Sequence, residues 1–104
     1  MINMRKEFLD EVGDTPIKMA KLCYREDYDA DFITFLLNEG YDKTQFDNFL
    51  RLIDFEYDNG YGVMHLNGCI WYKDGTWSER REYDGSEWWE FIWIPKFTNK
   101  FLPD

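Results

Sequence analysis

The sequence predicts an α+β domain, in which three to four short N-terminal helices pack on one face of a C-terminal four-stranded antiparallel β-meander. The second half of the chain contains four Asn-Gly or Asp-Gly pairs, each lying between stretches rich in aromatic and β-branched residues. Such pairs favour two-residue hairpin turns because both residues accept positive φ. The first half instead shows apolar residues at helical spacing, with start and stop signals. The four pairs are Asn59-Gly60, Asn67-Gly68, Asp74-Gly75 and Asp84-Gly85.

The pattern of apolar residues in the first half of the chain, about residues 3–54, predicts up to four helices. Gly13 ends the first, and Thr15-Pro16 has the pattern of a cap followed by proline at the first helical position. The last helix places four apolar residues on one face, namely Phe46, Phe49, Leu50 and Ile53. The predicted bounds are Asn3–Val12, Pro16 to about Arg25, Asp29 or Asp31 to Gly40, and Thr44 onward.

The meander, about residues 61–94, has a register fixed by its two-residue turns, because opposed residues share a face. This register sets Tyr72 opposite Trp77, Glu79 opposite Glu90, and Arg81 opposite Trp88. We expect the helices to cover the face that carries Met64, Leu66, Cys69, Trp71, Trp89, Phe91 and Trp93, with Lys73, Ser78, Arg80 and Glu82. The other face then carries Tyr61, Val63, His65, Ile70, Tyr72, Trp77, Glu79, Arg81, Tyr83, Trp88, Glu90 and Ile92. We expect residues 95–104 to form an irregular tail that docks on the domain.

Length and charge limit the class of protein. The 104 residues suit a single domain, and 20% aromatic residues argue against disorder. The balance of 12 basic and 21 acidic residues, a net charge of −9, disfavours direct contact with nucleic acid. It favours a partner protein with a cationic surface, such as one that itself binds nucleic acid. The alternative is that the charge only confers solubility.

Cysteine content and hydropathy predict a cytoplasmic protein. Cys23 and Cys69 are the only cysteines and lie in different halves of the chain, which suits free, buried thiols in a reducing compartment. The first residues lack the apolar run of a secretion signal, and no segment is long and apolar enough to span a membrane.

No catalytic, cofactor-binding or metal-binding residue is predicted. The run from Asp27 to Asp31 begins like a calcium loop, but Phe32 and Asn38 occupy the positions of the required glycine and glutamate. His65 is the only histidine, which argues against a zinc site. The sequence has no glycine-rich phosphate loop.

The second face of the meander is the main candidate surface. Glu79 opposite Glu90 is a repulsive pair unless Arg81 compensates, and Arg81 over Trp88 would form a cation–π contact. This surface suits a solvated face, a protein-binding face, or a carbohydrate or small-ligand site with paired carboxylates. The acidic segment near Glu26 is the second candidate, as a helix N-terminus. The candidate partner-binding residues are Glu26, Asp27, Asp29, Asp31, Tyr72, Trp77, Glu79, Arg81, Trp88 and Glu90.

The second half also resembles a known group of proteins. Three runs are similar to those of small uncharacterised proteins of tailed bacteriophages and prophages: Asp54-Phe-Glu-Tyr-Asp-Asn-Gly-Tyr-Gly62, Gly68-Cys-Ile-Trp-Tyr-Lys-Asp-Gly-Thr-Trp77 and Glu82-Tyr-Asp-Gly-Ser-Glu-Trp-Trp89. The resemblance implies a phage accessory protein made inside the infected bacterial cell, and it transfers no catalytic residue.

Together these observations predict a non-enzymatic acidic phage protein that binds and inhibits a host protein, of the anti-CRISPR or anti-restriction type. We expect it to need no cofactor and to be a monomer or a homodimer. Two alternatives remain open. One is a small-ligand or carbohydrate-binding module that uses the aromatic and carboxylate face, and the other is a structural or self-assembling phage protein.

Overall fold

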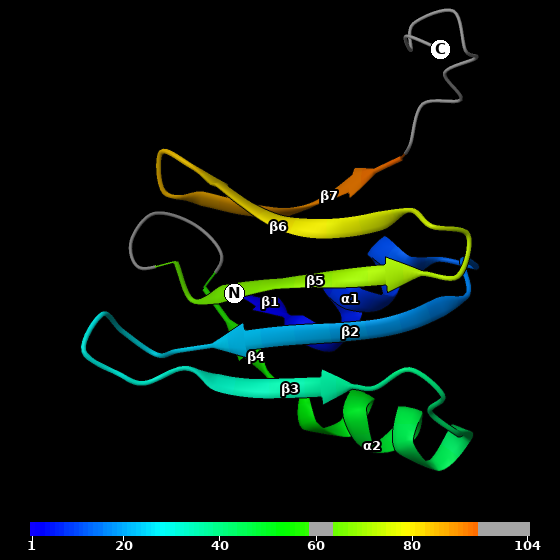
Figure 1. Ribbon diagram of the computed structural model, residues 1–104. Coiled ribbons are helices and arrows are strands. Elements are labelled where there is room, and N and C mark those ends of the chain that lie inside the picture. Colours follow the sequence, from blue (N-terminus) through cyan, green and yellow to red (C-terminus); the bar gives the residue numbers. More distant parts are fainter. Residues whose placement is uncertain (59–63, 94–104) are drawn as a thin grey trace, which may run out of the picture.

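The computed structural model describes residues 1–58 and 64–93 and shows a five-stranded antiparallel sheet with two helices (Figure 1). The strand order is β3-β2-β5-β6-β7. Helix α1 lies behind the sheet in Figure 1, and helix α2 packs beside β3. The large sheet consists of β2 (Ile17–Tyr24), β3 (Ile33–Leu37), β5 (Leu66–Tyr72), β6 (Trp77–Tyr83) and β7 (Ser86–Ile92). The other elements are β1 (Ile2–Asn3), α1 (Met4–Val12), α2 (Lys43–Leu52) and β4 (Glu56–Tyr57), with β1 paired to β4.

Both helices form where capping residues predict them. The Asn3 side chain accepts a hydrogen bond from the Lys6 backbone N–H at the start of α1, and Gly13 ends that helix at a φ of 55°. Asp42 and Gln45 form a capping box at the start of α2. The predicted helices at Asn3–Val12 and from Thr44 onward are therefore confirmed to within a residue or two.

The two middle helices predicted by the sequence are wrong. Pro16 to Arg25 and Asp29 or Asp31 to Gly40 instead form strands β2 and β3, which pair as an antiparallel hairpin. The buried residues of β2, Ala20 and Leu22, alternate with exposed Lys21 and half-buried Cys23, which is the period of a strand. Pairing with β5 overrides the weak helical pattern, and the domain is mostly β.

The predicted turn at Asn67-Gly68 is also wrong, because both residues lie inside the continuous strand β5. Gly68 faces Leu22 of β2, and a Cβ atom at Gly68 would lie 2.3 Å from the Lys21 carbonyl oxygen. The glycine permits a close approach of two strands and does not form a hairpin. The turn at Asn59-Gly60 and the tail at 95–104 lie outside the described residues. The described meander therefore has three strands, β5 to β7, in place of four.

The remaining two turns form, with different lengths. Asp84 and Gly85 have φ values of 52° and 85°, and this two-residue turn gives the predicted pairs Glu79 with Glu90 and Arg81 with Trp88. At Asp74-Gly75 the loop is one residue longer. The Tyr72 N–H donates to the Thr76 carbonyl at 2.9 Å, and Trp77 pairs with Trp71, so the predicted Tyr72–Trp77 pair is wrong.

This single-residue shift changes the composition of both faces. Cys69 and Trp71 move to the face away from the helices, and Ile70 and Tyr72 move into the core. Ser78, Arg80 and Trp89 remain on the helix-covered face, as predicted. The core joins the sheet to both helices through Met4, Phe8, Val12, Ile17, Ala20, Leu22, Leu37, Phe49, Leu50, Ile53, Tyr57, Leu66, Ile70, Tyr72 and Trp89.

The close approach at Gly68 gives a testable prediction. We expect Gly68→Ala to lower the free energy of unfolding by about 2–4 kcal/mol, because the new methyl group meets backbone atoms at a φ of 155°. Gly40→Ala is the control, since φ there is 85° but nothing lies within 4 Å of the added Cβ. It should cost about 1 kcal/mol. Urea unfolding measures both, and equal losses would contradict the close approach.

Candidate functional site

Arg80 of β6 is the centre of a buried polar network beneath helix α1. Its side chain is fully buried, and its Nη1 lies 3.1 Å from Glu7 Oε2 of α1. Its Nη2 donates a 2.6 Å hydrogen bond to the Tyr57 hydroxyl and lies 3.4 Å from Glu87 Oε1 of β7. The Tyr57 hydroxyl donates in turn to Glu7. One guanidinium therefore links α1, β4, β6 and β7.

Two further contacts extend this network. Glu87 Oε2 accepts a 3.0 Å hydrogen bond from the His65 backbone N–H, which fixes the approach to β5. The Ser78 hydroxyl donates to Glu11 Oε2 of α1 at 2.6 Å and lies 2.8 Å from the Tyr72 hydroxyl. Burial raises the pKa of Tyr57 far above its ordinary value, so this phenol stays protonated and can keep donating. The network is therefore a structural link between the helix and the sheet.

The opposite face of the sheet, which we call the open face, brings together five of the predicted partner-binding residues. Arg81 Nε lies 2.9 Å from Glu90 Oε2, and Arg81 Nη2 lies 3.5 Å from Glu79 Oε1. The Trp77 indole N–H donates to Glu79 at 3.1 Å, and Trp88 lies opposite Arg81. The predicted repulsion between Glu79 and Glu90 is thus relieved by the arginine between them. The open face is near neutral and partly aromatic.

Tyr72 does not belong to this surface. Its side chain is 1% exposed and lies on the helix-covered face, because of the longer turn at Asp74-Gly75. Trp71 and Cys69 take its place on the open face, beside Lys21 of β2. A shallow pocket of about 350 Å³ is lined there by Lys21, Cys23, Asn67, Gly68, Cys69, Trp71, Glu79 and Arg80, and its lining does not include Trp77 or Glu90.

The described residues show no activation of the Cys69 thiol as a nucleophile. Both cysteines are free and half-buried. Burial, with the nearby Glu79 carboxylate, raises the pKa of the Cys69 thiol, which keeps it protonated and weakly nucleophilic at neutral pH. His65 Nδ1 lies 2.8 Å from the Arg25 carbonyl oxygen, so the histidine is engaged by backbone.

The acidic candidates Glu26, Asp27, Asp29 and Asp31 lie in the loop between β2 and β3, and not at a helix N-terminus as predicted. The Asp27 carboxylate accepts hydrogen bonds from the backbone N–H groups of Asp29 and Ala30, which shapes the loop as an Asx turn. The Arg25 guanidinium lies over the rings of Tyr28 and Phe32, at 5.2 Å and 4.7 Å from their centroids. The loop therefore has a defined shape and a negative surface.

Three aromatic side chains at this end of the sheet are missing from the predicted site. Tyr28 is 67% exposed, Phe32 44% and Tyr83 76%. Tyr83 precedes the β6–β7 turn, which lies at the same end as the β2–β3 loop, together with Glu82 and Asp84 (Figure 1). We call this group the acidic end: Glu26, Asp27, Tyr28, Asp29, Asp31, Phe32, Glu82, Tyr83 and Asp84. The sequence signal that could have identified the acidic end is the alternation of aromatic and acidic residues in its loops.

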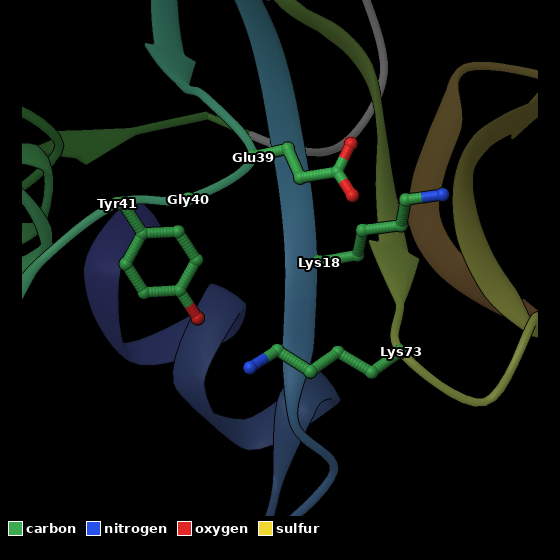
Figure 2. A pocket seen from close by; sticks show the side chains of 5 residues that line it. All are labelled: Lys18, Glu39, Gly40, Tyr41 and Lys73. Carbon is green, nitrogen blue, oxygen red and sulfur yellow. The ribbon is translucent and has the colours of Figure 1, made fainter.

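The opposite end of the sheet carries a pocket of about 370 Å³, lined by Lys18, Glu39, Gly40, Tyr41 and Lys73 (Figure 2). Figure 2 shows the Lys73 side chain reaching toward Tyr41, while Lys18 points the other way. The Tyr41 hydroxyl donates to the Ile17 carbonyl at 2.8 Å. The ammonium groups of Lys18 and Lys73 point in different directions, and the Glu39 carboxylate lines the same pocket. The pocket therefore does not direct two positive charges at one anionic ligand.

Other kinds of site lack support in the described part of the chain. Residues 1–58 and 64–93 contain no group of three or more His, Cys, Asp or Glu side chains that could hold a metal ion. Within the same residues, neither helix has the length and apolar character that crossing a membrane requires.

No protein-family model matches the chain, and neither a curated protein nor a solved structure matches it.

The buried network gives a prediction about stability. Arg80→Met should lower the free energy of unfolding by about 3–5 kcal/mol, because Glu7 and Glu87 are left without their buried counter-charge. Arg81→Met is the matched control on the exposed side of the same strand, and should cost less than about 1 kcal/mol. Guanidinium unfolding followed by tryptophan fluorescence measures both variants. A loss at Arg80 as small as that at Arg81 would show that the network is not structural.

Proposed function

We propose that this protein is a non-enzymatic acidic accessory protein of phage type, which binds a host protein in the bacterial cytoplasm and inhibits it. The contact is made by the acidic end, and the partner presents a cationic surface of the kind that binds nucleic acid. The observation that carries this proposal is the β2–β3 loop, where four exposed carboxylates alternate along the chain with the exposed rings of Tyr28 and Phe32.

The charges of the acidic end support a protein partner. Glu26, Asp27, Asp29 and Asp31 form no ion pair among the described residues, whereas Glu79 and Glu90 of the open face are neutralised by Arg81. Unneutralised surface charge of one sign steers association with a surface of the opposite sign. The negative potential of this chain is therefore available at the loop end and largely cancelled on the open face.

The exposed aromatic rings of the acidic end supply binding energy that surface charge alone does not. Binding energy in protein interfaces concentrates in a few large side chains, with Trp, Tyr and Arg prominent. Tyr28 is held beneath Arg25, so less side-chain entropy is lost when a partner covers it. Exposed carboxylates beside aromatic rings in one loop match a basic partner better than a nucleic acid, whose phosphates the carboxylates repel.

A small-ligand or carbohydrate-binding module is the second candidate. Its support is the hydrogen bond from Trp77 to Glu79 on an aromatic face. The shallow pocket nearby is lined by Glu79 but not by Trp77 or Glu90, so the paired carboxylates do not share one concave site. We therefore favour the protein partner.

The proposal predicts that binding depends on the loop carboxylates. With the chain as bait in host lysate, the triple variant Glu26→Gln, Asp29→Asn, Asp31→Asn should release its partner at lower salt and show a flatter salt dependence, because fewer charges contribute. Asp27 is kept because it shapes the loop. The control is Asp10→Asn, Asp14→Asn, Asp47→Asn, which removes the same formal charge outside the acidic end. An identical salt profile for both triples would overturn the charge-based contact.

A second prediction concerns the aromatic centre. Tyr28→Ala should weaken affinity for the captured partner by about tenfold or more, as for a residue that anchors an interface. Leu52→Ala, at a similarly exposed position on α2, should leave affinity unchanged. Titration calorimetry with the purified partner measures both. Equal affinities would place the contact elsewhere on the molecule.

A further inference from the structure

Strand β7 is an edge strand of the five-stranded sheet. It is the last strand in the order, and nothing in residues 1–58 or 64–93 pairs with its outer side. The opposite edge differs, because β3 has five residues and α2 packs against it, whereas β7 has seven. Proteins commonly blunt such edges with Lys, Pro, a bulge or an inward-pointing charge. Strand β7 has no Lys, Pro or bulge, and its inward-pointing Glu87 is paired with Arg80. Its exposed side chains include Trp88 and Phe91.

The hairpin geometry shows which backbone groups face outward. In a hairpin closed by a two-residue turn, the flanking residues form a hydrogen-bonded pair, and such pairs then alternate along the ladder. Tyr83 and Ser86 flank the turn, so Ser86 and every second residue after it bond to β6. The residues whose N–H and C=O groups point away from β6 are Glu87, Trp89 and Phe91.

The side-chain charges of β7 do not oppose pairing with a like strand. Its two carboxylates are already engaged by β6, Glu87 with Arg80 at 3.4 Å and Glu90 with Arg81 at 2.9 Å. The strand is otherwise apolar apart from Ser86. A second β7 therefore meets neutralised charges along the edge, although each whole chain carries −9.

We infer that β7 is a self-association edge, at which two copies of the chain pair antiparallel and form a continuous ten-stranded sheet. A two-fold axis perpendicular to the sheet requires that one residue pairs with the same residue of the other copy. We assign this position to Trp89, because it is the midpoint of Ser86–Ile92. This register joins the outward groups of Glu87 to those of Phe91 in the other copy. It also sets Trp88 opposite Glu90 of the other copy on the open face, beside the Arg81 that holds it.

Sedimentation of the full chain over a range of concentrations tests this inference. Phe91→Pro removes an outward N–H group that β6 does not use, so it should weaken dimerisation by about tenfold or more without disturbing the hairpin. Leu36→Lys, at an exposed position on the other edge strand, should leave the dimer unchanged. A wild-type chain that stays monomeric up to about 1 mM, the range of weak association, would overturn the proposal. Equal effects of the two variants would also overturn it.

Cross-linking tests the register even if Phe91→Pro does not fold. In a Cys23→Ser, Cys69→Ser background, the double variant Trp88→Cys, Glu90→Cys should form covalent dimers under mild oxidation, because positions 88 and 90 of two copies face each other as a non-hydrogen-bonded pair. The matched double variant Thr34→Cys, Leu36→Cys on β3 should remain monomeric on a non-reducing gel. Covalent dimers of the β3 variant, with none of the β7 variant, would contradict the assignment of β7 as the pairing edge.

Salt separates this inference from the proposed host contact. Two chains of charge −9 repel, so higher salt should strengthen the dimer by screening, whereas it should weaken binding to a cationic partner. The dimer can therefore fail while host binding survives, or the reverse. A dimer that weakens as salt rises would show that charge attraction, and not the β7 edge, holds it.

Discussion

The guanidinium of Arg80 sits inside the domain between the Glu7 carboxylate of α1, the Glu87 carboxylate of β7 and the hydroxyl of Tyr57 in β4. It also lies 5.4 Å from the centroid of Trp89. A buried charge is tolerated only when its partners are in place, so this arrangement favours one placement of α1 over the sheet. One side chain therefore contacts the N-terminal helix, the short β1–β4 pair and the last hairpin, and fixes their positions relative to one another.

This arrangement determines which surfaces remain for binding. With α1 held on one face, the open face, the β7 edge and the acidic end are left to solvent within the described residues. These surfaces differ in charge. Arg81 neutralises the carboxylates of the open face, while those of the β2–β3 loop form no ion pair with any cation of residues 1–58 and 64–93. Our two proposals therefore use different surfaces: contact by charge attraction at the loop, and backbone pairing at the β7 edge, which the net charge of −9 opposes.

Part of this fold could be predicted because local signals decide it. Asn3 and Asp42 cap their helices, and Asp84-Gly85 closes a hairpin whose register follows from the turn alone. The remaining errors come from long-range pairing. Residues 17–24 become a strand because β5 and β3 lie on both sides, and Gly68 serves close strand contact although Asn67-Gly68 resembles a turn.

The strand register behind the candidate surface could also be predicted only in part. The pairs Glu79–Glu90 and Arg81–Trp88 were accessible from the turn at Asp84-Gly85. Tyr72 was misplaced because one extra loop residue at Asp74-Gly75 exchanges the two faces. Arg80 on a predicted apolar face already signalled a buried counter-charge, but Glu7 lies too far along the chain for sequence spacing to identify it.

Hydrogen exchange on the chain bound to its captured host partner tests the functional account most directly. The account predicts new protection at residues 25–32 and around the β6–β7 turn, with the amides of α1 and α2 unchanged, because the acidic end makes the contact. Protection centred on the helices, with the β2–β3 loop exchanging as in the free chain, would contradict the assignment of function to the acidic end.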